Sequence, residues 1–543
     1  MLRLEIDGEE IVVAFDGANF RKYLSVMRAL QFPRFRGKER GWRFPVRLFP
    51  RFATVFPHLP EMPEMSGALY ARLTAEHEAR ERCLELQGQP DIEFEPPGFV
   101  GRLYAFQRVG AAFLARGRRV ALCDDVGLGK TVQAIAAVEE LFAAGEIDSV
   151  LIVAPGYLKR QWAREFERFT GGGVIPTVVE GTPAQRAEQW EQVENVAVVN
   201  YELLPRDEIA LARPWDLVIL DEAQEIKNSR TIASKLCRKI DAPLRWCLTA
   251  TAIENSLPEL FSIMEFLTPG AFGQWEEFDR RFILRDFWGG IKEYRGLDEV
   301  REIIRPHVLR RRVEDCISNF PAKDSEILEV QFDGLQRLAY EDVRTGLLEC
   351  SDEYRAMSVN SALALQQTMY LREACDHTSL IARDLEGGSA KLEPLRELLE
   401  AIRGAGEKAI IFTEWERMAR ILKDELGGNC LTGRMGFGRR DAILKQWREG
   451  DDHLITTDCS KQGLNLQEAN WVINFEPHWN PAVMRQRVGR AWRLTQERPV
   501  HARAFVVRGT IEERMIDVLN GKVKLFEEIL DGLSGPPKKE SIE

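Results

Sequence analysis

Short runs of apolar residues recur along the first half of the chain, separated by segments long enough to hold a helix. The runs cover residues 120–123, 150–154, 196–199, 217–220 and 245–251. Continuous apolar runs that alternate with helix-length segments are typical of parallel strands covered by helices on both faces. The pattern therefore predicts a first α/β unit built around a parallel sheet.

A second series of apolar runs lies in the last third of the chain. It covers residues 409–415, 453–458, 471–477 and 500–507. Between the two series, the pattern becomes helical and charged, with RPHVLRRRVED (305–315) at its centre. We therefore expect a second, mainly parallel sheet, separated from the first by helical insertions.

Local composition sets the expected boundaries between these parts. Residues 84–100 combine Pro, Gly and acidic residues without a sustained apolar period, which is typical of a linker. We place a boundary near residue 95, after a small accessory domain, and expect the polar tail to be disordered. The predicted parts are residues 1–95, 96–320 (first unit with a helical extension), 321–388 (helical insertion or linker), 389–530 (second unit) and 531–543 (tail).

Length and composition limit the class of protein. A chain of 543 residues exceeds the ~250–300 residues that one hydrophobic core supports, so several domains are expected. No apolar run approaches the ~18 residues that a membrane span needs, so we expect no membrane partner. Nine cysteines without C-x-x-C spacing are typical of a reducing compartment. The net charge of -11 excludes a generally basic surface but not a local basic groove.

The stretch LCDDVGLGKT (122–131) lies where the first apolar run gives way to a helical pattern. Gly127 and Gly129 allow backbone N–H groups to approach phosphate oxygens, and Lys130 places a cation against the outer phosphates. Thr131 offers a hydroxyl to a magnesium ion at a helix N-terminus. The stretch therefore predicts a phosphate-binding loop, although Asp124 stands where the general pattern has its first glycine.

A pair of acidic residues follows a later apolar run. Asp221 and Glu222 come directly after LVIL (217–220), at the carboxyl end of a predicted strand, where open α/β sheets collect ligands. Together with the phosphate loop, Asp221 is expected to hold magnesium. Glu222 is expected to orient or deprotonate the attacking water.

These motifs and others resemble, in order and spacing, those of the Swi/Snf-like ATPases of helicase superfamily two, whose loop typically carries acidic residues before its first glycine. In the first unit they are LYAFQ (103–107), VAPGYLKRQW (153–162), DEAQEIKN (221–228), LTATAIEN (248–255), FSIMEFLTPGAFG (261–273) and RPHVLRRRVEDC (305–316), and LREACDH (371–377) follows in the helical insertion. In the second unit they are IIFTEW (410–415), TTDCSKQGLNLQ (456–467) and QRVGRAWRLTQ (486–496). The resemblance implies two RecA-like lobes, with helical insertions between them and a small N-terminal accessory domain.

The resemblance extends the set of expected nucleotide-binding residues, with Gln107 as the reader of adenine. The set is Gln107, Asp125, Gly127, Leu128, Gly129, Lys130, Thr131 and Gly463. Arg490 and Arg493 lie three positions apart, so on a helix they share one face, as two guanidinium groups aimed at one phosphate must. The family implies that they act as arginine fingers, which makes Lys130, Glu222, Arg490 and Arg493 the expected catalytic residues.

The family also implies stepping along double-stranded DNA, driven by closure of the two lobes on ATP. The expected DNA contacts are Lys159, Gln161, Trp162, Ser460, Gln462 and Trp479, and contacts to phosphates carry little sequence preference. For Trp479 a structural brace is the favoured alternative. Cys375 and His377 resemble a pair of metal ligands, but no second pair lies at zinc-finger spacing. A packing role is therefore favoured for both residues.

Residues 28–57 interleave arginines with aromatic side chains, a composition that suits nucleic-acid stacking. The stretch faintly resembles the HARP domain of annealing helicases. A packing or protein-binding module is an equal alternative, because Trp42 and Phe44 are also spaced as one face of a core strand.

Two classes of function fit the sequence. The first is an ATP-dependent double-stranded DNA translocase that remodels DNA structures or protein–DNA complexes. The second is a nucleotide-dependent interaction module, such as an RNA polymerase recycling factor, driven mainly by a protein partner. We expect ATP and Mg²⁺ as cofactors, a monomer, and duplex or forked DNA as partner, with a polymerase or repair factor as a candidate protein partner. The expected location is the cytoplasm, at the nucleoid, in a bacterium or virus, and the nucleus in a eukaryote.

Overall fold

The computed structural model describes most of the chain, and the parts described divide into two compact units. Described are residues 2–7, 10–15, 42–45, 64–250, 256–287, 289–318, 320–332, 334–355, 361–381, 388–433, 435, 437–450, 452–457, 466–493 and 496–530. The first unit contains residues up to Asp124 and Lys130–Arg311, and the second contains Asp125–Gly129 and Arg312–Glu528. No helix in the described ranges is long and apolar enough to cross a membrane.

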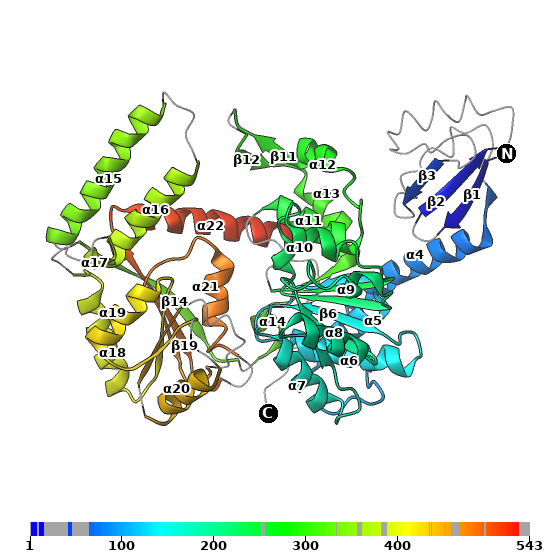
Figure 1. Ribbon diagram of the computed structural model, residues 1–543, viewed down its shortest axis with the longest axis horizontal. Helices are drawn as coiled ribbons and strands as arrows, with labels where there is room; N and C mark the ends of the chain where they lie inside the picture. Colours follow the sequence, from blue (N-terminus) through cyan, green and yellow to red (C-terminus); the bar gives the residue numbers. More distant parts are fainter. Residues whose placement is uncertain are drawn as a thin grey trace. The chain divides into compact units, whose positions relative to one another are not determined.

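A seven-stranded sheet forms the centre of the first unit, with the order β13-β5-β10-β9-β6-β8-β7 and parallel pairing throughout (Figure 1). Its strands are β5 (Arg119–Leu122), β6 (Val150–Ala154), β7 (Thr177–Val178), β8 (Val196–Asn200), β9 (Leu217–Asp221), β10 (Leu244–Leu248) and β13 (Val308–Leu309). All five strands predicted for this unit are confirmed, because each is an almost fully buried apolar run.

Helices surround this sheet and extend beyond it. They are α5 (Ala105–Arg116), α6 (Lys130–Ala143), α7 (Lys159–Phe169), α8 (Pro183–Glu191), α9 (Ile209–Ala212), α10 (Ile232–Cys237), α11 (Leu257–Leu267), α12 (Trp275–Phe282) and α13 (Leu297–Ile304), with a hairpin of β11 (Ile283–Arg285) and β12 (Ile291–Tyr294). The helical prediction for 305–315 is wrong in its centre. A 3-10 turn, η5 (Arg305–His307), leads into strand β13, and helix returns only in the short α14 (Val313–Cys316).

The N-terminal segment forms a four-stranded sheet in the order β3-β2-β1-β4, followed by a long helix. Its elements are β1 (Leu2–Asp7), β2 (Glu10–Phe15), β3 (Trp42–Pro45), β4 (Glu64–Met65) and α4 (Gly67–Gln87). The structure differs from the expected boundary near residue 95. Cys83, Leu86 and Phe94 belong to the core of the first unit, and the Gln87 side-chain amide donates to the Val308 carbonyl at 2.9 Å. Apart from 42–45, the arginine- and aromatic-rich stretch lies outside the described residues.

The second unit contains a six-stranded parallel sheet in the order β14-β19-β18-β15-β17-β16. Its strands are β14 (Lys323–Val330), β15 (Ala409–Thr413), β16 (Asn429–Leu431), β17 (His453–Thr457), β18 (Trp471–Asn474) and β19 (Val500–Val507). The helices are α15 (Gly334–Arg355), α16 (Ser361–Asp376), α17 (Thr378–Ile381), α18 (Leu392–Gly404), α19 (Glu416–Leu426), α20 (Phe437–Glu449), α21 (Pro481–Val488) and α22 (Ile511–Leu530).

The four strands predicted for the second unit are confirmed, but β14 falls in the segment predicted to be a helical linker. This edge strand pairs with β19 along its whole length, and most of its side chains are exposed. Its charged residues are held by the neighbouring strand, since Arg503 contacts Asp324 at 2.6 Å and Glu326 at 3.1 Å. Exposure on both faces explains why no apolar run marks it.

A buried ionic cluster lies in the core of the second unit. The Lys391 ammonium contacts Asp376 at 2.9 Å and Glu512 at 2.6 Å, and all three side chains are buried. The Trp415 indole and the Val507 backbone N–H donate to the outer oxygens of the two carboxylates. Burial raises the pKa of Asp376 and raises that of Glu512 to about 7, while Lys391 opposes both shifts.

Removing the cation from this cluster should cost substantial stability. Lys391→Met is expected to lower the free energy of unfolding by about 3–5 kcal/mol, since it leaves two buried carboxyl groups without a counter-charge. Because the pKa values of these carboxyls lie above their unfolded values, the folded state binds more protons and the loss should shrink as pH falls from about 8 to about 5. Urea unfolding of the wild-type protein and of Lys391→Met at about pH 8 and about pH 5 measures the loss in the free energy of unfolding.

The matched control is Arg396→Met, whose exposed pairs with Glu393 and Glu425 should contribute less than about 1 kcal/mol. Equal stability of Lys391→Met and the control would contradict a structural role for the buried cluster.

Candidate active site

Three loops that are far apart in sequence start at one edge of the first sheet. β10 lies between β5 and β9, and its last residue Leu248 pairs with Leu122 on one side and Asp221 on the other. The chain therefore leaves all three strands at the same carboxyl edge, which is where open parallel sheets bind ligands. The loop 123–129, the residues after Asp221 and those after Leu248 meet there.

The phosphate loop has the backbone that the sequence predicts. Gly127 and Gly129 adopt φ angles of 96° and 74°, a region that glycine enters without strain. Helix α6 starts at Lys130, so Thr131 lies in its first turn. The Lys130 ammonium donates to the Asp124 carbonyl at 2.7 Å. Leu128 is buried, so its side chain supports the loop from inside.

Asp124, which replaces the first glycine of the general pattern, is a buried structural anchor. Its carboxylate accepts hydrogen bonds from both Nε and Nη2 of Arg311 and from the Gln133 amide on α6, and the Arg311 side chain is 3% exposed. Arg311 also donates to Gln133 at 2.8 Å and to the Phe106 carbonyl on α5. Arg311 is not among the site residues that the sequence predicts. The available signal was the charge of Asp124, because a charged side chain at a buried position needs a partner.

Asp221 is a buried carboxylate held in one orientation. Its Oδ2 accepts from the Trp162 indole at 2.7 Å, and its Oδ1 accepts from the Glu222 backbone N–H at 2.9 Å. Burial, followed by the charge of Glu222, raises the pKa of Asp221 to about 7, although these two hydrogen bonds and Lys130 act in the opposite direction. An oriented carboxylate whose charge is poorly compensated is a suitable ligand for a cation.

Glu222 has the only positive φ angle among the described non-glycine residues, with φ 49° and ψ 55°. Such strain is typical of functional sites, where the surroundings hold it in place. The Gln224 amide donates to the Glu222 carboxylate at 2.7 Å, and the Thr249 hydroxyl donates to Gln224 at 2.8 Å. This chain links the residue after β10 to the carboxylate after β9, and sequence spacing gave no sign of it. Thr251 lies outside the described residues.

The structure corrects two of the expected DNA contacts on α7. Trp162 is 1% exposed and bonded to Asp221, and Lys159 is 4% exposed and donates to the Val179 carbonyl at 2.6 Å. Neither side chain presents a surface to a DNA phosphate, because α7 turns this face toward the sheet. Gln161 is half-buried and stays a prediction.

Gln107 has a second role besides the predicted reading of adenine. It lies in the first turn of α5, is 5% exposed, and its side-chain oxygen accepts from the Tyr104 backbone N–H at 3.1 Å. This bond satisfies an amide that would otherwise have no partner within the helix. The side chain is thereby held in a fixed orientation.

In the second unit, the predicted helix through both arginine fingers is wrong. Helix α21 ends at Val488, and Arg490 and Arg493 lie in the turns that follow. Arg493 donates to the Gly489 carbonyl at 2.8 Å. Burial, together with the positive charge of Arg490, lowers the pKa of Arg493 to about 9. The two cations are therefore close enough to repel, an arrangement that an anion would relieve.

Gln496 fixes the end of this segment, a role that the sequence analysis missed. Its side-chain amide donates to the carbonyls of Gln467, Ala469 and Ala491 at 3.0, 2.9 and 3.1 Å. Because one buried amide joins the turn that carries the arginines to residues 467–469, at the end of the TTDCSKQGLNLQ motif, the two segments keep a fixed spacing.

The remaining predicted residues divide into two groups. Ser460, Gln462 and Gly463 lie outside the described residues, and the half-buried Trp479 stays a prediction. Cys375 is fully buried, and burial raises the pKa of its thiol well above the ordinary value. Within the described ranges, no group of three or more His, Cys, Asp or Glu side chains is arranged to hold a metal ion.

Both units resemble known proteins. Among curated proteins, the chain is 31% identical over 460 residues to the ATP-dependent helicase/translocase YwqA of Bacillus subtilis, covering 80% of this chain and 49% of YwqA. It is 29% identical to the ATP-dependent helicase YqhH of the same organism, covering 76% of each. The chain thus spans about half the length of YwqA.

A solved structure with similarity is the Sulfolobus solfataricus SWI2/SNF2 ATPase core in complex with dsDNA. It is 26% identical and covers 81% of this chain and 95% of that core, with a TM-score of 0.41. Residues 390–495 match the helicase conserved C-terminal domain. Residues 106–380, half of the chain, match the SNF2-related domain, so the chain belongs to the SNF2-related family.

Proposed function

We propose that this protein is a DNA-dependent ATPase that uses ATP hydrolysis to move along double-stranded DNA and to remodel DNA structures or protein–DNA complexes. The observation that carries the proposal is the meeting of the phosphate loop with Asp221 and Glu222 at one sheet edge. Family membership and relatives named as ATP-dependent helicases support it.

Each residue of the edge has a role in this reaction. The backbone of the phosphate loop and Lys130 bind the phosphates, and Glu222 orients the attacking water and accepts its proton. Thr131 and Asp221 would hold a magnesium ion, whose charge would neutralise the β- and γ-phosphate oxygens. The fit rests on Asp221, a buried, oriented carboxylate with a raised pKa. Arg490 and Arg493 are proposed to stabilise the charge on the transferred phosphoryl group.

The test is the rate of ATP hydrolysis measured with duplex DNA, single-stranded DNA, RNA and no polymer. We expect strong stimulation by duplex DNA. A rate that none of the polymers changes would overturn the proposal and favour an ATPase that responds to a protein partner. A triplex-displacement assay then tests movement, because a translocating protein strips the third strand without separating the duplex.

Trp162→Phe should weaken the use of magnesium. The ring is retained, but the donor to Asp221 is lost, and groups that orient a metal ligand typically affect metal affinity by about 10–100-fold. We expect the magnesium concentration for half-maximal ATP hydrolysis to rise by about tenfold or more. The matched control is Trp190→Phe, which removes an indole donor to Asp207 at 3.3 Å, away from the site. Equal magnesium dependence in the two variants would contradict the role of Trp162.

A further inference from the structure

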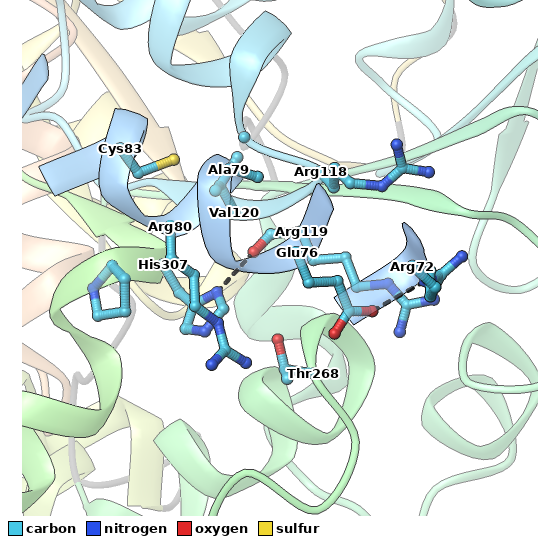
Figure 2. Close-up of a pocket in the computed structure, with 12 residues that line it drawn as sticks. Arg72, Glu76, Ala79, Arg80, Cys83, Arg118, Arg119, Val120, Thr268 and His307 are labelled. Atoms are coloured by element: carbon cyan, nitrogen blue, oxygen red, sulfur yellow. Dashed lines mark hydrogen bonds and ion pairs between the residues drawn. The ribbon is translucent and has the colours of Figure 1, made fainter. Parts of the chain in front are cut away.

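A second cavity lies at the opposite end of β5 from the phosphate loop. Residues 117–120, at the start of β5, form one wall, while α4 and the η5 turn form others (Figure 2). Thr268, which follows α11, completes the lining. None of these residues belongs to the nucleotide site, so the cavity needs a separate explanation.

Positive charge exceeds negative charge around this cavity. Four arginines line it, Arg72, Arg80, Arg118 and Arg119, against a single carboxylate. That carboxylate, Glu76, is already paired with Arg72 at 3.0 Å. The His307 ring contacts the Arg119 carbonyl at 2.9 Å through Nδ1 (Figure 2). Burial, with Arg80 nearby, lowers the pKa of His307 to about 4, so it is neutral at pH 7 and adds no charge.

Several polar groups of the cavity lack a partner. The Thr268 hydroxyl has no hydrogen-bond partner, and the residue is 6% exposed. Within the described part of the chain, neither Arg80 nor Arg118 makes a side-chain hydrogen bond or ion pair. Burial and then the charges of Arg72 and Arg119 lower the pKa of Arg118, although Glu76 and Glu146 act in the opposite direction. A buried hydroxyl without a partner and an arginine without an ion pair are groups that an oxyanion would satisfy.

The size of the cavity limits what it can hold. Its volume is about 40 Å³, and one water needs about 10–15 Å³ on this measure, so it holds a group of about three waters' size. That matches a tetrahedral oxyanion. An adjoining cavity of about 480 Å³ shares Arg80, Thr268, Pro306 and His307, which leaves room for the rest of a phosphorylated ligand.

We propose that this cavity is a second phosphate-binding site, in which Arg80 and the Thr268 hydroxyl hold a single phosphate group. The group is either free phosphate or a phosphate of a nucleic acid, two sources with the same chemistry. The site lies outside the ATP-hydrolysing residues, so it does not depend on the proposed function.

Calorimetric titration of the full-length protein with sodium phosphate, against sodium chloride at equal ionic strength, tests the site. Lys130→Ala serves as the background, because it weakens phosphate binding at the phosphate loop. We expect saturable binding that Arg80→Gln and Thr268→Val each weaken by about 10–100-fold, the usual effect of losing a hydrogen bond to a charged group. Arg116→Gln, an exposed arginine on α5, is the matched control and should bind normally.

Arg80→Lys retains the charge without the forked donor and should restore part of the affinity, which separates loss of a ligand contact from misfolding. The same variants are then titrated with duplexes that carry either a 5′-phosphate or a 5′-hydroxyl. Weakening of the 5′-phosphate duplex alone identifies a terminal phosphate, equal weakening of both identifies the backbone, and weakening of inorganic phosphate alone identifies the free ion. If the cavity variants bind every probe as the control does, the proposal is overturned.

Discussion

Arg493→Ala and Arg490→Ala are each expected to leave ATP binding near normal while DNA-stimulated turnover falls by about 10³–10⁵-fold. That loss corresponds to about 4–7 kcal/mol of transition-state stabilisation, far more than an exposed charge contributes. The physical reason is the repulsion between the two neighbouring cations, which burial strengthens and a developing negative charge would relieve. Single-turnover hydrolysis and nucleotide binding must be measured separately.

The double variant should lose little more than either single variant, because both guanidinium groups are proposed to act on the same charge. Arg498→Ala, an exposed arginine a few residues on, is the control and should keep the normal rate. If Arg490→Ala or Arg493→Ala retains most of the rate of hydrolysis, that arginine is an ordinary surface residue and does not act as an arginine finger.

Lys130→Ala should abolish turnover and weaken ATP binding, because it removes the single cation that the phosphate loop contributes. Glu222→Gln should instead bind ATP normally and hardly hydrolyse it, since Asp221 and the loop are unchanged and glutamine can still accept from Gln224. The comparison uses phosphate release with saturating duplex DNA and equilibrium binding of a fluorescent nucleotide.

Lys239→Ala, an exposed lysine of the first unit, is the control for loss of charge. Parallel loss of binding and turnover in Glu222→Gln would mean that Glu222 supports the fold of the site rather than the chemistry. An unchanged rate in Lys130→Ala would show that the loop does not bind the phosphates.

The strands could be predicted where burial on both faces leaves an unbroken apolar run. β13 and β14 were not predicted from the sequence, for opposite physical reasons. β13 has two residues and is followed by arginines, so its pairing with β5 leaves no pattern in the sequence. β14 is long, but exposed charged residues hold it to β19, and that pairing is invisible without the partner strand.

The features of the site likewise divide into those that the sequence predicts and those that it does not. Asp221 and Glu222 could be predicted because they lie at the end of a strand, and Lys130 because it ends the glycine-containing loop that follows another strand of the same sheet. The contacts of Arg311 with Asp124, and of Trp162 with Asp221, join residues far apart in sequence. Trp162 was misread because its neighbours on α7 are charged, whereas its own face of the helix is buried.

The hydrogen bond between Gln107 and the start of α5 bears on which nucleotide we expect the protein to accept. Adenine and guanine both present an acceptor at N7, but beside it adenine presents a donor, its N6 amino group, where guanine presents the acceptor O6. A carbonyl oxygen has two lone pairs, and that of Gln107 uses one to cap the helix. The atom that we propose tells ATP from GTP is thus fixed by the backbone that it caps. Fraying of the first turn of α5 would therefore relax the choice between purines before it impaired the grip on the phosphates.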